Sequence, residues 1–126
     1  MYSRRNTEAV ERRRARRARE DQSARLRNEV PDLQQLQLAV TAFRGQAQIA
    51  EARHVRRFVV EQAPALFVLP CTDSSCQDGG HDVTTAILRA LRAHLERFEG
   101  ENACNGRVGT AECARVLHYV GTATYR

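Results

Sequence analysis

The chain has 126 residues, of which 42% are hydrophobic, and it contains no tryptophan. This length fits a single domain with a modest core, and no apolar run reaches the roughly 18 residues that a membrane span requires, so we predict no membrane association. The formal net charge of +5 favours polyanionic partners, and all 20 basic residues are arginine.

The first part of the chain carries the whole net charge. Residues 1–30 contain ten arginines and five acidic residues, whereas residues 31–126 contain ten of each. Six of the arginines fall within the eight residues RRRARRAR at 12–19. Alanine, glutamate and arginine dominate this segment, and no glycine or proline precedes Pro31, which favours a helix. We therefore predict that residues 1–30 form an arginine-rich arm, helical or partly disordered, attached to a domain at 31–126.

A dense block of arginine attracts nucleic acid, because its guanidinium groups displace counterions from the phosphate backbone. We expect residues 4–27 to bind the phosphates of RNA, DNA or a ribonucleoprotein with little sequence preference. The alternatives are a solvated tail that only aids solubility and an arm that binds an acidic protein partner. The candidate phosphate-binding residues are Arg4, Arg5, Arg12, Arg13, Arg14, Arg16, Arg17, Arg19, Arg25 and Arg27.

Two segments beyond the arm have the composition of strands. In residues 33–43, LQQLQLAVTAF, every second residue from Leu36 to Ala42 is apolar, and this period of two predicts a half-buried strand. Residues 54–71, HVRRFVVEQAPALFVLPC, are rich in valine and phenylalanine. Pro64 interrupts this run, which predicts two strands or a strand at the edge of a sheet.

Residues 82–98 are predicted to form one helix. Asp82 offers an N-cap, and apolar residues recur at helical spacing as far as Phe98, so one stripe is expected to pack on the sheet. Residues 113–125 suit a strand or a helix, and their β-branched and aromatic content favours a strand. The predicted fold class is α+β: a small antiparallel sheet, one packed helix at about 82–98, a zinc-finger-like four-cysteine site and a basic N-terminal helical arm.

All four cysteines lie between residues 71 and 113. Cys71 and Cys76 are five residues apart, Cys104 and Cys113 are nine apart, and each pair lies in a run of small polar residues that permits tight turns. Two such pairs separated by a folded unit are the usual components of a structural zinc site, so we predict zinc bound by four thiolates. The layout resembles a zinc ribbon or a treble clef only loosely, because those sites keep about two to four residues between paired cysteines.

Alternatives remain open at this centre. His81 could replace one cysteine as a ligand, or it could pack beside the site and donate a hydrogen bond. Iron would bind the same four thiolates. The cysteines could also be buried thiols or disulfides, but residues 1–30 contain no apolar segment typical of a signal peptide, so we expect a cytoplasmic protein with reduced cysteines.

The sequence contains no recognisable catalytic motif. His81 is followed by Asp82 and Val83, which does not match the H-x-E and C-x-x-C pattern of zinc deaminases. The P-loop, GxGxxG and GxSxG motifs are also absent from the sequence. We therefore predict a non-enzymatic, nucleic-acid-associated protein. A protein–protein adaptor or homo-oligomeric structural protein and a thiol or zinc redox sensor are the alternatives.

Overall fold

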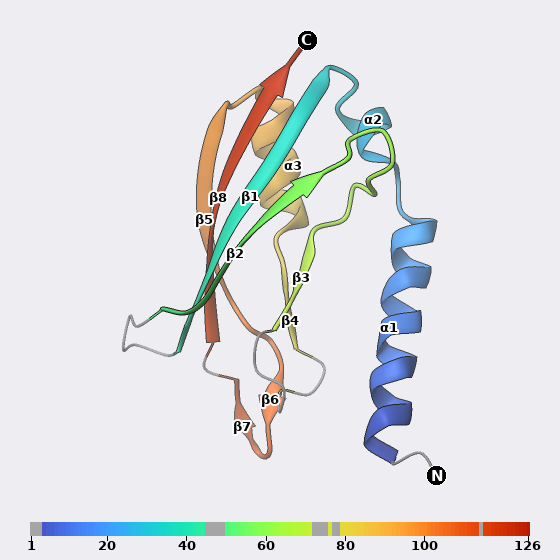
Figure 1. Ribbon diagram of the computed structural model, residues 1–126, viewed down its shortest axis with the longest axis vertical. Helices are drawn as coiled ribbons and strands as arrows, with labels where there is room; N and C mark the ends of the chain where they lie inside the picture. Colours follow the sequence, from blue (N-terminus) through green and yellow to red (C-terminus); the bar gives the residue numbers. More distant parts are fainter. Residues whose placement is uncertain (1–3, 45–49, 72–75, 77–78, 114) are drawn as a thin grey trace.

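The computed structural model describes residues 4–44, 50–71, 76, 79–113 and 115–126. The helices are α1 (Arg4–Gln22), α2 (Leu26–Glu29) and α3 (Thr84–Arg92). The strands are β1 (Leu33–Arg44), β2 (Ala50–Phe58), β3 (Val68–Pro70), β4 (Gly80–Asp82), β5 (Arg97–Ala103), β6 (Arg107–Val108), β7 (Ala111–Glu112) and β8 (Arg115–Tyr125). The main sheet has four antiparallel strands in the order β2-β1-β8-β5, while β3 pairs with β4 and β6 with β7 (Figure 1). The predicted mixture of helix and strand with a small antiparallel sheet is confirmed.

The long strands β1 and β8 form the centre of the sheet and show the expected alternation. In β1, Leu36 and Leu38 are buried, whereas Gln35 and Gln37 on the opposite face are exposed or half-buried. In β8 the buried positions include Leu117, and the strand pairs with β1 on one side and β5 on the other. The predicted strand at 33–43 is therefore confirmed, and the C-terminal segment is a strand rather than a helix.

The segment that contains Pro64 forms two separate strands, as its proline indicated. β2 ends at Phe58, and β3 begins at Val68. Between them Pro64 forms an isolated β-bridge with Arg25, which ties this connection to the chain before α2. β3 then leads directly to Cys71, so a strand positions the first cysteine.

Helix α3 ends earlier than predicted because the chain changes direction at His94. This residue has a φ of 55°, the left-handed conformation that commonly follows the last helical turn. The amide of His94 donates to the carbonyl of Leu91, and the amide of Leu95 donates to the carbonyl of Ala90, each at 3.1 Å. Together these two bonds form a Schellman motif, which closes the C-terminus of a helix.

The predicted helix over 82–98 is therefore wrong after Arg92. Its predicted N-cap is also wrong, because Asp82 ends β4 and the N-cap of α3 is Val83. Phe98, expected on the helical stripe, is buried instead as part of β5, and Leu95 is 45% exposed. The apolar spacing in the sequence continues past the end of the helix because Phe98, a buried residue of β5, lies at the position where a further helical turn would also require an apolar residue.

Substitution of His94 tests this helix end. Valine is β-branched and tolerates a positive φ poorly, so His94→Val is expected to lower the free energy of unfolding by about 2 kcal/mol. His94→Asn is the matched control, because it also removes the imidazole but tolerates the left-handed conformation. Denaturant titration should separate the two variants, and equal midpoints would contradict a backbone origin for the effect.

The hydrophobic core lies between the sheet and the helices. Ile87 and Leu91 of α3 are fully buried and belong to the same cluster as Leu38 and Leu117 of the sheet. α2 contributes Leu26, which is 0% exposed. The core thus begins before residue 30, whereas it includes no residue of α1 in the described part of the chain.

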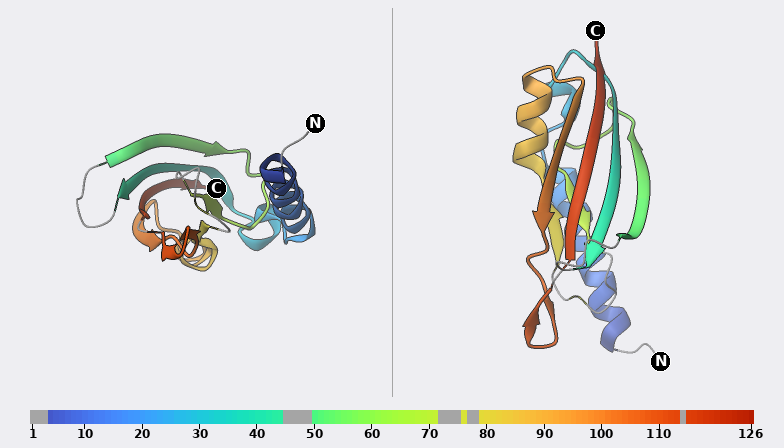
Figure 2. Two further views of the ribbon diagram at one scale, coloured as in Figure 1. Left: turned by 90° about the horizontal axis from the view of Figure 1, so that it is seen from below. Right: turned by 90° about the vertical axis from the view of Figure 1, so that its left-hand side faces the viewer.

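The helices lie on one side of the main sheet. Figure 2 shows α1, α2 and α3 on the concave side, and no helix lies over the convex face of β2, β1, β8 and β5. Among the described residues, no helix has both the length and the apolar character that crossing a bilayer would demand. α1 instead extends along one side of the molecule towards the end at which β6 and β7 lie (Figure 1).

Candidate metal centre and arginine-rich arm

The four cysteines converge on one point although they come from three separate parts of the fold. Cys71 follows β3, Cys76 lies between β3 and β4, Cys104 follows β5, and Cys113 follows β7. Their sulfur atoms all lie within 4.8 Å of one another. The structure therefore brings together the four residues that the sequence suggested as ligands.

The spacing of the sulfur atoms is compatible with a single metal ion. The Sγ atoms of Cys71 and Cys113 are 3.7 Å apart, and those of Cys76 and Cys104 are 3.6 Å apart. Four sulfurs placed tetrahedrally at about 2.3 Å from a metal would be about 3.8 Å apart. Each close contact joins one cysteine of the first sequence pair to one of the second, so a metal here would connect β3 to the segment after β5.

The wide spacing of the second pair has a structural cause. Cys104 and Cys113 flank the hairpin β6–β7, and the Cys113 amide donates to the Gly106 carbonyl at 2.9 Å across its base. The two-residue turn begins with Gly109 at φ 64°, a conformation that glycine adopts without steric cost. A hairpin inserted between two ligands thus brings together cysteines nine residues apart, which the sequence pattern alone did not indicate.

The pKa values of two of the four thiols are shifted in opposite directions. Burial raises the pKa of Cys104, but hydrogen bonds from the Gly106 amide and from the other three cysteines outweigh this effect and lower the pKa below its usual value. The Gly106 amide lies 3.4 Å from Cys104 Sγ. For Cys76, burial and hydrogen bonds to the other cysteines raise the pKa. A bound divalent cation would supply positive charge that stabilises the thiolate forms of these side chains.

Gly79 was not recognised as part of the site from the sequence. A Cβ atom at this position would lie 2.2 Å from Cys76 Sγ and 2.7 Å from Cys104 Sγ, so only glycine leaves room for both sulfurs. At the adjacent Gly80 the nearest atom would be the Leu69 carbonyl oxygen at 3.5 Å, an ordinary contact. The Gly79–Gly80 pair was visible in the sequence, but nothing there distinguished the two positions.

Gly79→Ala is accordingly expected to displace two candidate ligands and to weaken metal binding about 10- to 100-fold. Gly80→Ala is the matched control, since its methyl group meets no sulfur, and it should bind like the parent chain. Competition with a chromophoric chelator measures both affinities. Equal affinities for the two variants would contradict the role of Gly79 in leaving room for the two sulfur atoms.

His81 lies beside the centre, and the group of four ligand atoms does not include it. The side chain is 1% exposed, and its Nδ1 donates to the backbone carbonyl of Asn102 at 2.9 Å. Burial lowers the pKa of His81, against the opposing effect of the bonds to Asn102, which favours the neutral imidazole. Because Asn102 lies two residues before Cys104, this bond connects β4 to the strand that delivers the third cysteine.

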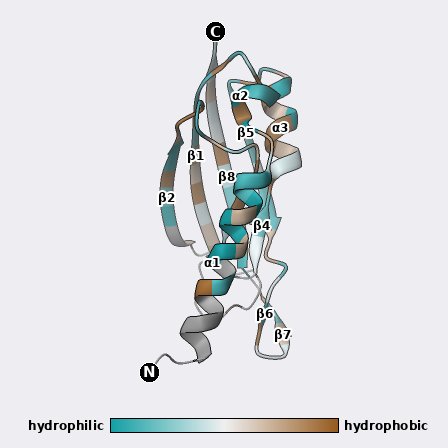
Figure 3. Ribbon diagram, turned by 90° about the vertical axis from the view of Figure 1, so that its right-hand side faces the viewer, coloured by the Kyte–Doolittle hydropathy of each residue, from teal (hydrophilic) through white to brown (hydrophobic). Residues whose placement is uncertain are grey.

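The helix α1 carries most of the candidate phosphate-binding residues. The side chains of Arg13, Arg14, Arg17 and Arg19 are exposed, and no ion pair involves them within the described residues. Figure 3 shows that the coloured part of α1 is predominantly hydrophilic, with few apolar positions. The side chains of three further candidates lie outside the described residues, namely Arg4, Arg5 and Arg12.

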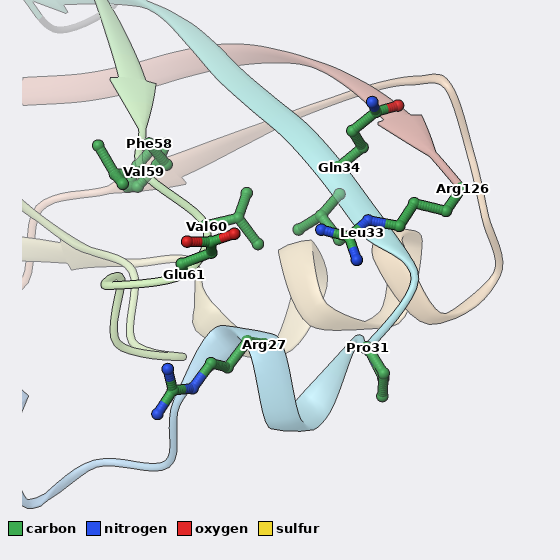
Figure 4. Close-up of a pocket in the computed structure, with 9 residues that line it drawn as sticks. All are labelled: Arg27, Pro31, Leu33, Gln34, Phe58, Val59, Val60, Glu61 and Arg126. Carbon is green, nitrogen blue, oxygen red and sulfur yellow. The ribbon is translucent and has the colours of Figure 1, made fainter.

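The remaining candidates differ in position from one another. Arg16 is a half-buried residue of α1, whereas Arg25 and Arg27 lie beyond the end of that helix. Arg25 donates to the Gln62 carbonyl at 3.3 Å, so this guanidinium already has a partner within the domain. Arg27 lies with Arg126 at a pocket of about 480 Å³ beside β1 and the end of β2 (Figure 4). We therefore expect the arginines of α1 to contribute more to binding than these two.

Comparison with known proteins identifies no relative of this chain. It matches no protein-family model, no curated protein and no solved structure at a significant level. Function is therefore inferred from the chemistry of the four-cysteine centre and of α1.

Proposed function

We propose that this protein is a zinc-stabilised, nucleic-acid-associated protein without enzymatic activity. In this proposal the four-cysteine centre fixes the fold, and α1 binds the phosphate backbone of RNA, DNA or a ribonucleoprotein. The observation that carries the proposal is the set of exposed arginines on α1, Arg13, Arg14, Arg17 and Arg19, none of which forms an ion pair within the described residues.

Zinc is the metal that this donor set suits best. Four thiolates form a closed tetrahedral site that leaves no position for substrate, and such sites are structural rather than catalytic. The ion would be held by Cys71, Cys76, Cys104 and Cys113, and it would supply positive charge and a cross-link. A reducing compartment such as the cytoplasm would keep these thiols available for metal.

The length and charge of α1 suit a phosphate backbone. A helix of 19 residues is about 28 Å long, and one DNA strand presents about eight phosphates over that distance. Arginine binds phosphate oxygens through a planar fork, and this contact carries no base information. Tyr2 is the only aromatic residue of residues 1–30, so stacking on bases would add little.

A salt titration tests the proposal. Binding of labelled RNA and of DNA duplexes of unrelated sequence should weaken steeply with salt, with a slope of log K against log salt of about −4.5 for five phosphate contacts to duplex DNA. Affinity should differ little among sequences. Absence of binding at low salt, or binding that salt does not weaken, would contradict a phosphate-binding arm, and the second result would favour an adaptor protein.

A further inference from the structure

The pocket beside the start of β1 has a chemistry that neither the metal centre nor the arm uses. It lies between α2, the first residues of β1 and the segment that follows β2 (Figure 4). Its volume of about 480 Å³ falls within the range typical of sites for small molecules.

The walls of this pocket are fixed by bonds between backbone groups. The amide of Leu26 donates to the carbonyl of Ala63 at 3.0 Å, which joins α2 to the segment after β2. The amide of Arg126 donates to the carbonyl of Asp32 at 2.8 Å, which holds the chain after β8 beside the start of β1. A ligand would therefore enter a pocket that is already formed, and it would lose little affinity to the ordering of the chain.

The floor of the pocket is apolar. Leu33 is 2% exposed and Val60 is 8% exposed, and both belong to the hydrophobic core. Phe58, which also lines the pocket, is half-buried and packs against that core. This floor favours a ligand with a hydrocarbon body, because its binding removes apolar surface from water.

One guanidinium group reaches this floor. The side chain of Arg126 extends across Leu33 towards Val60, whereas the guanidinium of Arg27 points away from it (Figure 4). Neither arginine forms an ion pair within the described residues. Glu61 lines the pocket on the side opposite Arg126 (Figure 4). The pocket thus offers one positive group over an apolar floor, together with one negative group that repels excess negative charge.

We propose that this pocket binds a small organic acid that has a single carboxylate and an apolar body. The planar fork of Arg126 matches a carboxylate, and Leu33 and Val60 contact the hydrocarbon part. A phosphate monoester carries a charge of about −1.5 to −2 at pH 7, so Glu61 disfavours it more than a carboxylate. Both the apolar floor and the charge balance therefore select a monocarboxylate.

Octanoate is the probe that tests this site, and NMR spectra of the full chain with labelled leucine and valine methyl groups locate it. Octanoate should shift the methyl signals of Leu33 and Val60. Affinity should rise about three- to fourfold for each methylene group added from butanoate to octanoate. Octanamide has the same size without the charge, and it should bind about tenfold more weakly.

Substitutions at the two charged groups have opposite expected effects. Arg126→Gln should weaken octanoate binding about tenfold and remove the preference for octanoate over octanamide. Glu61→Gln should strengthen octanoate binding about two- to threefold, because it removes a like charge from the same pocket. Both side chains are exposed, so the fold should be unaffected. Arg107→Gln, in β6, is the matched control and should bind octanoate like the parent chain.

Three results would overturn the site. These are methyl signals of Leu33 and Val60 that octanoate does not shift, equal affinities for octanoate and octanamide, and an Arg126→Gln chain that binds like the parent. Weaker binding by Glu61→Gln would also contradict the proposed charge of the ligand. Octanoate held by the arginines of α1 would leave both methyl signals unchanged and so gives the first of these results. Nucleic acid takes no part in these measurements, so they are independent of the phosphate-binding proposal.

Discussion

Cys113→Ser is expected to abolish high-affinity zinc binding and to lower the free energy of unfolding by more than about 4 kcal/mol. Cys113 holds the end of the β6–β7 hairpin against Cys71, and serine supplies no thiolate to the ion. Loss of a structural metal is among the few single changes with effects of this size. A thermal melt should show a transition at least about 10 °C below that of the parent chain.

Two controls distinguish the effect of losing the metal from other effects of a substitution in the hairpin. Ala111→Ser changes an exposed residue of the same hairpin and should melt like the parent. A strong chelator should lower the melting temperature of the parent chain but not that of Cys113→Ser, because the variant has no ion left to lose. If Cys113→Ser melts like the parent chain, the cysteines do not stabilise this fold through a metal.

Replacing the six arginines of residues 12–19 by glutamine is expected to weaken nucleic-acid binding about 100- to 1,000-fold at low salt. If four of these six arginines contact phosphate, the slope of log K against log salt should become less steep by about 3.6, since each lost phosphate contact removes about 0.9. The fold should be unaffected, because no residue of α1 belongs to the hydrophobic core in the described part of the chain. Filter binding over a range of salt concentrations measures both quantities.

The matched variant replaces the same six arginines by lysine. It keeps the charge and should keep the salt slope, with only a modest loss of affinity from the missing planar forks. Equal binding by the glutamine variant and the parent chain would contradict a role for the arm. A glutamine variant that loses its cooperative melt would show instead that α1 stabilises the domain.

The elements predictable from the sequence are those whose signal is local. The alternation from Leu36 to Ala42 depends only on which side chains face the core, and β1 follows it over these residues. The end of α3 could not be predicted in this way, because His94 gives no stop signal comparable to glycine or proline. The central position of β8 between β1 and β5 depends on pairing between distant segments, which no local pattern encodes.

The cysteine cluster was predictable in its members but not in its construction. Residue type and pairing were enough to bring Cys71, Cys76, Cys104 and Cys113 together as candidates. The role of Gly79 follows from the 2.2 Å that would separate an added Cβ atom from Cys76 Sγ. The hairpin between the cysteines of the second pair depends on the turn at Gly109. Both are properties of the folded chain, so they could be recognised only in the structure.

The most direct test of a zinc-stabilised fold is metal content combined with thiol titration on protein purified without added metal. We predict one zinc ion per chain and four thiols that react only after a chelator or a denaturant is added. If iron were found in place of zinc, the four-cysteine metal centre would still be supported, and only the identity of the metal would be corrected. Absence of any metal, together with four thiols that react at once in the folded chain, would contradict the account.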